Sequence, residues 1–220
     1  MKESKKSLII GITGIIDFIL WTILIQTVDV EPVGQNGTTV GFAMINTVFH
    51  NLTGVHMSIY TITDWLGLVP IFICLGFGGV GFVQLIKRKS LFKVDFDIIA
   101  LGVYYIIVIM FYLVFEMIPI NYRPILIDGF MEASYPSSTT LLVLSVMPTL
   151  VFQINRRIKA GIMAKIIVYA SNLFSIFMVL GRTIAGVHWL TDIIGSLLIS
   201  AGLFLTYKGI VLNYDERHGA

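Results

Sequence analysis

Residues 97–117 read DIIALGVYYIIVIMFYLVFEM, and no charged residue lies between Asp97 and Glu116. A bilayer core of about 30 Å needs about 20 apolar residues in a helix, so this stretch predicts a transmembrane helix. The same criterion predicts six spans in all, at about 8–28, 66–86, 97–117, 138–155, 162–181 and 189–207. The chain is 56% hydrophobic and only 13% charged, which excludes a soluble domain. We therefore predict an all-α integral membrane protein, a single six-helix bundle over residues 1–220.

The basic residues fall on one side of this bundle. Thirteen of the fifteen lysines and arginines flank the same ends of the spans: Lys2, Lys5, Lys6, Lys87, Arg88, Lys89, Lys93, Arg156, Arg157, Lys159, Lys165, Lys208 and Arg217. By the positive-inside rule this side is cytoplasmic, together with both termini. Arg123 and Arg182 remain on the outer side, in loops at about 118–138 and 181–192. A shared anionic ligand is the simplest reason for two arginines there.

The first outer loop, from about 28 to 64, begins with turn signals and continues as a moderately apolar stretch. It predicts one or two short helices in the membrane interface, with an apolar stripe formed by Phe42, Ile45, Phe49 and Leu52. His50, His56 and Asp64 then lie on the outer side, either as solvated loop residues or near the two arginines.

Asp17 lies inside the first predicted span. A carboxylate facing lipid would cost about 2.5–3.5 kcal/mol at the bilayer centre, so we expect it to face the bundle. Both a functional role and a structural hydrogen bond to a neighbouring span fit that position.

The most polar outer stretch is GRTIAGVHWLTD, residues 181–192. His188 and Asp192 are four residues apart, so on a helix they share one face and the carboxylate can orient the imidazole. Arg182 lies just upstream, and its planar guanidinium suits a phosphate. An ordinary helix start with a few polar residues is the alternative interpretation.

A second outer stretch, Pro136 followed by Ser137, Ser138 and Thr139, marks the start of the fourth span. Ser137 or Ser138 is a natural N-cap there. The unpaired N–H groups of a helix start also favour an anion, so the stretch fits an anion site or plain capping.

These outer pieces, in this order on six spans, resemble the type 2 phosphatidic acid phosphatase superfamily of membrane lipid phosphatases. Its motifs are a lysine separated by six residues from Arg-Pro, then Pro-Ser-Gly-His, then Ser-Arg with five residues to His and three more to Asp. Arg123-Pro124, Pro136-Ser137 and the Arg182, His188, Asp192 spacing match, with Gly181 where serine is usual. The match covers about the C-terminal half of the chain.

The resemblance implies that His188 attacks phosphorus and forms a phosphohistidine, while Asp192 orients it. It also implies that Arg123 and Arg182 hold the phosphoryl oxygens, with Ser137, Ser138 and Thr139 at the helix start completing the cradle. Such chemistry is covalent catalysis with electrostatic stabilisation and needs neither metal nor cofactor. Cys74 is the only cysteine, which also excludes a cysteine-based metal site.

Two positions depart from the family pattern. The motif-one lysine is Glu116, and the motif-two histidine, which protonates the leaving alcohol in the family, is Thr139. Another group could supply the acid, with His50 and His56 first and Asp64 next, or the leaving group could need none. A phosphate leaving group is a far weaker base than an alkoxide, so the sequence favours an isoprenoid diphosphate over phosphatidic acid.

We therefore predict a lipid phosphatase or phosphotransferase working at the outer leaflet of the cell membrane. Two alternatives remain: a non-catalytic binder of lipid phosphates, and a small transporter that uses Asp17 as its coupling group.

Overall fold

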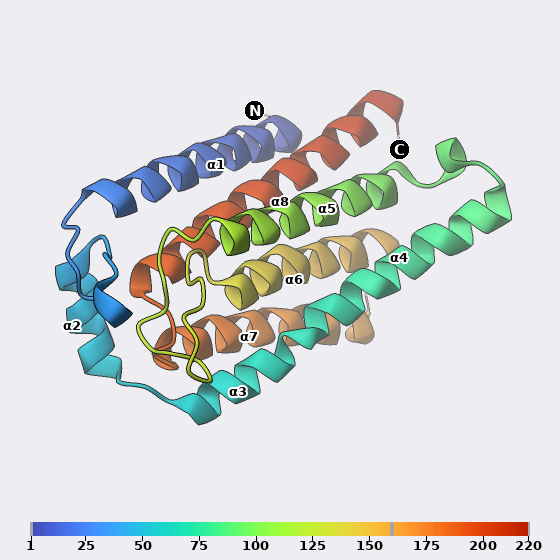
Figure 1. The fold of residues 1–220 in the computed structure, drawn as a ribbon. Coiled ribbons are helices and arrows are strands. Elements are labelled where there is room, and N and C mark those ends of the chain that lie inside the picture. Colours follow the sequence, from blue (N-terminus) through green and yellow to red (C-terminus); the bar gives the residue numbers. More distant parts are fainter. Residues whose placement is uncertain (1, 159–160, 220) are drawn as a thin grey trace.

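The protein is described from a computed structural model that covers residues 2–158 and 161–219; Lys159, one of the predicted cytoplasmic cations, lies outside these ranges. The helices are α1 (Glu3–Thr27), α2 (Ala43–Thr53), α3 (Met57–Leu66), α4 (Leu68–Arg88), α5 (Phe96–Met117), α6 (Ser138–Arg157), α7 (Ile162–Ile184) and α8 (Leu190–His218), with 3-10 turns at Gln35–Gly37 and Leu91–Lys93. Both termini lie at one end of the bundle, and α2, the link between α5 and α6 and the turn between α7 and α8 lie at the other (Figure 1).

Six helical segments in the described ranges are long and apolar enough to cross a membrane, which confirms the predicted fold class. Two ends differ most from the prediction. The second span begins earlier, because only Gly67, itself in helical conformation, separates α3 from α4, and the two form one apolar segment from Met57 to Arg88. The sixth helix continues past 207 to His218, where a double contact from Arg156 to Asp215 and a stack of Phe96 on Tyr214 hold its polar last turns.

Small residues let α1 lie directly against α8. A Cβ added at Gly11 would lie 2.5 Å from the backbone nitrogen of Thr206, and one added at Gly202 would lie 2.8 Å from that of Ile15. Glycine at such positions allows two membrane helices to approach closely. The first and last spans therefore form one packed pair.

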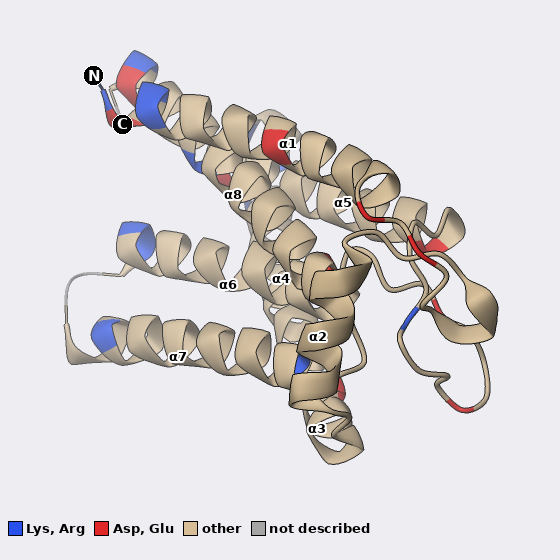
Figure 2. Cartoon of the chain, turned by 90° about the vertical axis from the view of Figure 1, so that its left-hand side faces the viewer, with Lys and Arg blue, Asp and Glu red and all other residues tan. Residues whose placement is uncertain are grey.

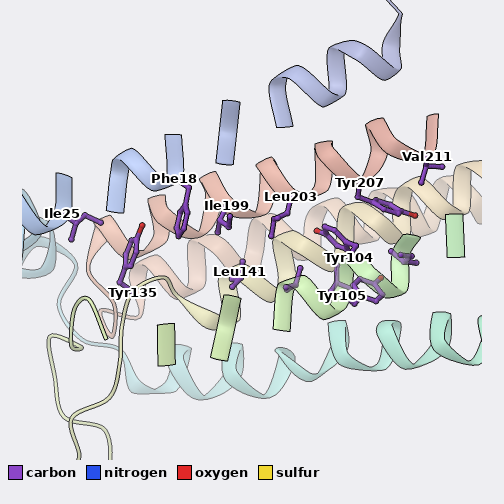
Figure 3. Packing of buried hydrophobic residues seen from close by; sticks show 13 residues of the cluster. Phe18, Ile25, Tyr104, Tyr105, Tyr135, Leu141, Ile199, Leu203, Tyr207 and Val211 are labelled. Carbon is purple, nitrogen blue, oxygen red and sulfur yellow. The ribbon is translucent and has the colours of Figure 1, made fainter. Parts of the chain in front are cut away.

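An aromatic core joins this pair to α5 and to the outer link (Figure 3). The ring of Phe18 in α1 stacks on that of Tyr135 with 5.9 Å between centroids, and the Tyr135 hydroxyl lies 2.7 Å from Thr22 Oγ1. Tyr135 adjoins Pro136 at the start of α6, so this packing anchors the predicted anion-binding stretch to α1.

Most basic segments lie at the end that holds both termini (Figure 2). There the buried Asp97 of α5 accepts hydrogen bonds from Arg157 Nη2 at 2.7 Å and Arg156 Nε at 3.4 Å. Pairing of this kind satisfies a buried carboxylate that would otherwise be costly. The network ties α5 to α6 at the end opposite the candidate site.

The first outer loop contains one short α-helix, α2, which carries an exposed apolar face, whereas α3 continues into the second span. Ile45 and Leu52 of the predicted stripe are exposed, together with Met44 and Val48. Phe42 instead stacks on Trp21 of α1 at 5.1 Å. This helix therefore has the exposed apolar face of an interfacial helix on one side and is held to the bundle on the other.

The expectation that Asp17 faces the bundle is wrong. Its neighbour Phe18 is buried against α5 and Tyr135, which places Asp17 on the exposed side of α1 between Ile16 and Leu20. The close packing of glycines against α8 determines the rotation of α1, and that rotation overrides the preference of one carboxyl group.

Candidate active site

The turn between α7 and α8 brings Arg182 and His188 together. Arg182 lies in the last turn of α7 and is completely buried. Gly186 has a φ of +69°, and a Cβ added there would lie 1.9 Å from the carbonyl oxygen of Gly54. Only glycine fits such a left-handed position against another backbone. The first outer loop thus packs directly on the turn that carries the candidate nucleophile.

His188 lies before α8 rather than on it. The helix begins at Leu190, so the predicted shared helical face of His188 and Asp192 is wrong for the histidine. Asp192 is the third residue of the helix, and its Oδ2 accepts a hydrogen bond from the Trp189 backbone N–H at 2.9 Å. This is the acidic half of a capping box, and it fixes the carboxylate beside the turn.

Ser134 joins the imidazole to the carboxylate. His188 Nδ1 lies 3.8 Å from Asp192 Oδ2, too far for a hydrogen bond. The hydroxyl of Ser134 donates a short hydrogen bond to Asp192 Oδ2, while its oxygen and its backbone carbonyl oxygen each lie 3.1 Å from His188 Nδ1. The other carboxylate oxygen of Asp192 accepts a hydrogen bond from Asn121 Nδ2 at 3.3 Å. The carboxylate therefore acts on the ring through Ser134.

The contacts of His188 determine its tautomer. Its Nε2 lies 3.2 Å from Arg182 Nη2, and a guanidinium can only donate. Nε2 is therefore the acceptor, and the ring proton is on Nδ1, directed at Ser134. Burial of the ring, and after it the charges of Arg123 and Arg182, hold the pKa of His188 well below its usual range. The unprotonated Nε2 is the atom that a nucleophilic histidine needs.

The guanidinium of Arg182 lies at the centre of the site. Its Nη1 lies 3.6 Å from Asp64 Oδ1 and 3.5 Å from Thr63 Oγ1, and its Nε has no hydrogen-bond partner among the described residues. The guanidinium carbons of Arg182 and Arg123 lie 4.9 Å and 5.6 Å from the centre of the Tyr60 ring. Tyr60 thus contacts both arginines and holds two like charges near one another by cation–π attraction.

Arg123 comes from the outer link, where Tyr122 and Ala133 form an isolated antiparallel bridge. Its side chain is buried, and its Nε lies 3.1 Å from Glu132 Oε2. That contact is an ion pair without a directed hydrogen bond, because neither Nε nor Nη1 has a hydrogen-bond partner in the described chain. Buried donors without acceptors are costly unless a ligand satisfies them. The two arginines together therefore offer free donors for an anion.

Ser137, Ser138 and Thr139 at the start of α6 have different environments. Ser137 is the N-cap residue, but its hydroxyl pairs with Thr140 Oγ1 at 3.0 Å and makes no capping bond. Its backbone is held against α8, since Ser196 Oγ donates to the Ser137 carbonyl at 3.0 Å. Ser138 and Thr139 are half-buried and face a cavity. The first-turn N–H groups of α6 are accordingly free of capping by Ser137.

That cavity has a volume of about 500 Å³ and runs between α4, α5 and α6. Its walls are mostly apolar, and its polar lining includes Asp64, Ser138 and Thr139, with Leu68, Val108 and Leu142 among the apolar residues. A polar end that includes Asp64, the partner of Arg182, and an apolar body suit a molecule with a phosphate head and a hydrocarbon tail.

The two outer histidines lie near the site without joining it. His50 stacks obliquely on Trp189 at 5.6 Å, and burial lowers the pKa of His50. His56 is exposed, and its Nε2 lies 2.9 Å from the Thr53 carbonyl oxygen. Within the described ranges neither ring hydrogen-bonds to His188 or to the arginines. Glu116 is exposed at the outer end of α5.

Sequence reasoning did not identify Ser134 or Tyr60, and it ranked Asp64 behind the histidines. None of the three belongs to a sequence motif. Each comes close to the other site residues only in the folded chain. In the described residues no group of three or more His, Cys, Asp or Glu side chains could hold a metal ion.

The model of one protein family, described as the PAP2 superfamily, matches residues 98–215, more than half of the chain. The chain belongs to the PAP2 superfamily. The matched segment contains Arg123, Ser134, Arg182, His188 and Asp192, whereas Asp64 and Tyr60 lie before it.

Among solved structures, this PAP2 chain is similar in fold to the first transmembrane PAP2 type phosphatidylglycerolphosphate phosphatase from Bacillus subtilis. The match has 16% sequence identity and a TM-score of 0.62, and it covers 94% of this chain and 96% of that one. At that identity the likeness shows the fold. No curated protein matches the PAP2 chain.

Proposed function

We propose that this PAP2 protein is a membrane phosphatase that hydrolyses a lipid diphosphate through a phosphohistidine on His188. The observation that carries the proposal is the contact of His188 Nε2 with Arg182 Nη2 at 3.2 Å, with Nδ1 held by Ser134. A phosphoryl group bound to Arg182 would lie next to the lone pair of the nucleophile. Positioning of that kind supplies much of the acceleration in phosphoryl transfer.

In the first step Nε2 attacks the terminal phosphorus, and the bond from phosphorus to the leaving oxygen breaks. The positive charge that develops on the ring is stabilised by Asp192 through Ser134, while Asn121 holds the other oxygen of the carboxylate. Arg123 and Arg182 neutralise the phosphoryl oxygens with donors that are otherwise unpaired. In the second step water attacks phosphorus, the phosphorus–nitrogen bond breaks, and inorganic phosphate leaves.

The diphosphate assignment rests on Thr139. A threonine hydroxyl cannot protonate an alkoxide effectively, whereas a lipid monophosphate can depart as an anion. The cavity beside Thr139 would hold the hydrocarbon chain, and an isoprenoid chain is the tail we favour. The distribution of basic residues supports cytoplasmic termini and an active site at the outer leaflet. We also propose that the reaction needs no metal, since arginines supply the positive charge.

The test is phosphate release by purified protein from an isoprenoid diphosphate and from phosphatidic acid, measured for the native chain and His188→Ala. We expect release from the diphosphate, and acid-labile phosphate on native protein quenched during turnover. Ser200→Ala, a hydroxyl change in the helix core, is the matched control. Near-normal turnover by His188→Ala would overturn the mechanism. Lipid phosphate binding without release by the native chain would favour the non-catalytic binder.

A further inference from the structure

One guanidinium separates Asp64 from the nucleophile. Arg182 places its Nη2 atom 3.2 Å from His188 Nε2 and its Nη1 atom 3.6 Å from Asp64 Oδ1. A phosphoryl group held by these two nitrogens would therefore have the imidazole on one flank and the carboxylate on the other. The leaving group departs from the side of the phosphorus that lies away from the imidazole, which is the side of Asp64. Water must later enter on that same side.

Asp64 also lines the same cavity as the residue that replaces the family histidine. It lines the cavity together with Ser138 and Thr139. Gly67, one turn further on, packs against the same threonine: a Cβ added there would lie 3.2 Å from Thr139 Cγ2 and 2.9 Å from the Asp64 carbonyl oxygen. Gly67, between α3 and α4, thus packs close to both Asp64 and Thr139, which line the same cavity.

The side chain of Asp64 is exposed, unlike that of the buried carboxylate Asp192. The Asp64 side chain is 56% exposed, whereas Arg182 is completely buried. Asp192, the buried carboxylate of the site, is fully engaged by Ser134, Trp189 and Asn121. Asp64 lines the open cavity, from which a water molecule can reach its carboxylate, as the base of a hydrolytic step requires.

We propose that Asp64 is the general base that activates water for hydrolysis of the phosphohistidine, in place of the absent histidine at position 139. This rests on the proposed function. The water oxygen bonds to phosphorus, one water proton passes to the Asp64 carboxylate, and the phosphorus–nitrogen electron pair returns to His188 Nε2. The proton then leaves to solvent with departure of phosphate. The role proposed for Asp64 is to accept a proton from water, which is distinct from protonating an alkoxide leaving group.

A carboxylate that only held Arg182 in place would give a different result. Its removal would loosen phosphate binding and slow both steps together. Removal of a base slows only the second step, because attack by Nε2 needs no proton acceptor beyond the ring. The ratio of the two rates therefore separates the two roles.

The experiment follows a single turnover of an isoprenoid diphosphate labelled at the terminal phosphorus, by rapid quench. In Asp64→Asn we expect phosphoenzyme to form at nearly the native rate and to accumulate. Its hydrolysis should slow by a factor on the order of 10²–10⁴, the range for loss of a general base. Hydroxylamine, which attacks without prior deprotonation, should restore release of the label.

Four further variants sharpen this test. Asp64→Glu should retain most of the hydrolysis rate, and Thr139→His should restore it in the Asp64→Asn background. Glu132→Gln removes the acidic partner of the other arginine and should leave the ratio of the two rates unchanged. Asp64→Ser gives the same ratio test if the asparagine variant does not fold.

Hydrolysis at the native rate in Asp64→Asn or Asp64→Ser overturns the proposal, and so does equal slowing of both steps. If the proposed function itself is wrong, the result is different, because no labelled phosphoenzyme would form on the native protein.

Discussion

Ser134 lies between His188 and Asp192 and contacts both, its hydroxyl donating to the carboxylate while its two oxygens face Nδ1 of the imidazole. A single residue of the link between α5 and α6 therefore connects Asp192 to the imidazole that we propose as the nucleophile. The backbone carbonyl would still accept the Nδ1 proton if the hydroxyl were lost. The hydroxyl and the carbonyl can thus be tested separately.

Ser134→Ala should slow phosphoenzyme formation by a factor of about 10–100, since a hydrogen bond to a charged group contributes about 1.5–3 kcal/mol. Asp192→Asn should slow it further, because that change removes the charge as well. Single-turnover quench measures both. Ser145→Ala, a buried hydroxyl of α6 far along the helix, controls for loss of a core hydrogen bond. Equal rates for Ser134→Ala and the native chain would exclude the bridge.

The dependence of the first step on pH follows from the depressed pKa of His188. Nε2 must be unprotonated to attack. Acid therefore stops the reaction only at a pH low enough to protonate Nε2. The acid limb of phosphoenzyme formation should therefore lie below about pH 6.5, the ordinary value for imidazole. Arg123→Gln removes one of the charges responsible and should move the limb upward. At substrate concentrations far below saturation the free substrate titrates identically with both proteins, and under that condition a limb at or above about pH 6.5 in the native chain would contradict the assignment.

Gly181 occupies the position where the family motif has serine. A Cβ added there would lie 2.7 Å from Thr63 Cγ2, so Gly181→Ser should destabilise the protein by about 1–3 kcal/mol through overpacking. Thr63→Ser removes that methyl group and keeps the hydroxyl that faces Arg182. The double variant should recover most of the loss, as measured by thermal unfolding in detergent. Additive effects of the two changes would show that the methyl group is not the obstacle.

Orientation in the membrane can be tested with two exposed phenylalanines in a Cys74→Ser background. Phe130 lies in the outer link, and Phe92 lies in the 3-10 turn between α4 and α5. Phe130→Cys should react with an impermeant thiol reagent on intact cells, and Phe92→Cys only after permeabilisation. The reverse pattern would place the arginines in the cytoplasm.

The spans could be predicted because length and apolar composition decide whether a helix crosses a bilayer, whatever its neighbours are. The rotation of each helix could not, and Asp17 shows why. Its exposed position follows from how Gly11 and Gly14 meet α8, which no pattern within α1 contains. The extension of α8 likewise depends on Arg156, a residue of another helix.

The residues of the candidate site likewise fall into those that the sequence could identify and those that it could not. Arg123, Arg182, His188 and Asp192 stand at motif spacings, so the sequence could identify them. Ser134 and Tyr60 act through contacts with residues more than 50 positions away, and a lone serine or tyrosine has many ordinary explanations. The direct bond expected between His188 and Asp192 is replaced by a bridge because the helix begins at Leu190.

The start of α8 is held from outside the segment that matches the family. Trp21 Nε1 donates to the Thr191 carbonyl at 3.1 Å, and the Asn46 amide group bonds to the Thr191 hydroxyl and backbone nitrogen at 3.0 Å and 3.3 Å. Thr191 adjoins Asp192, so α1 and α2 determine where the carboxylate lies. A chain severed in the link between α4 and α5 should therefore regain turnover only when both pieces are produced together, since neither fragment holds the complete catalytic geometry.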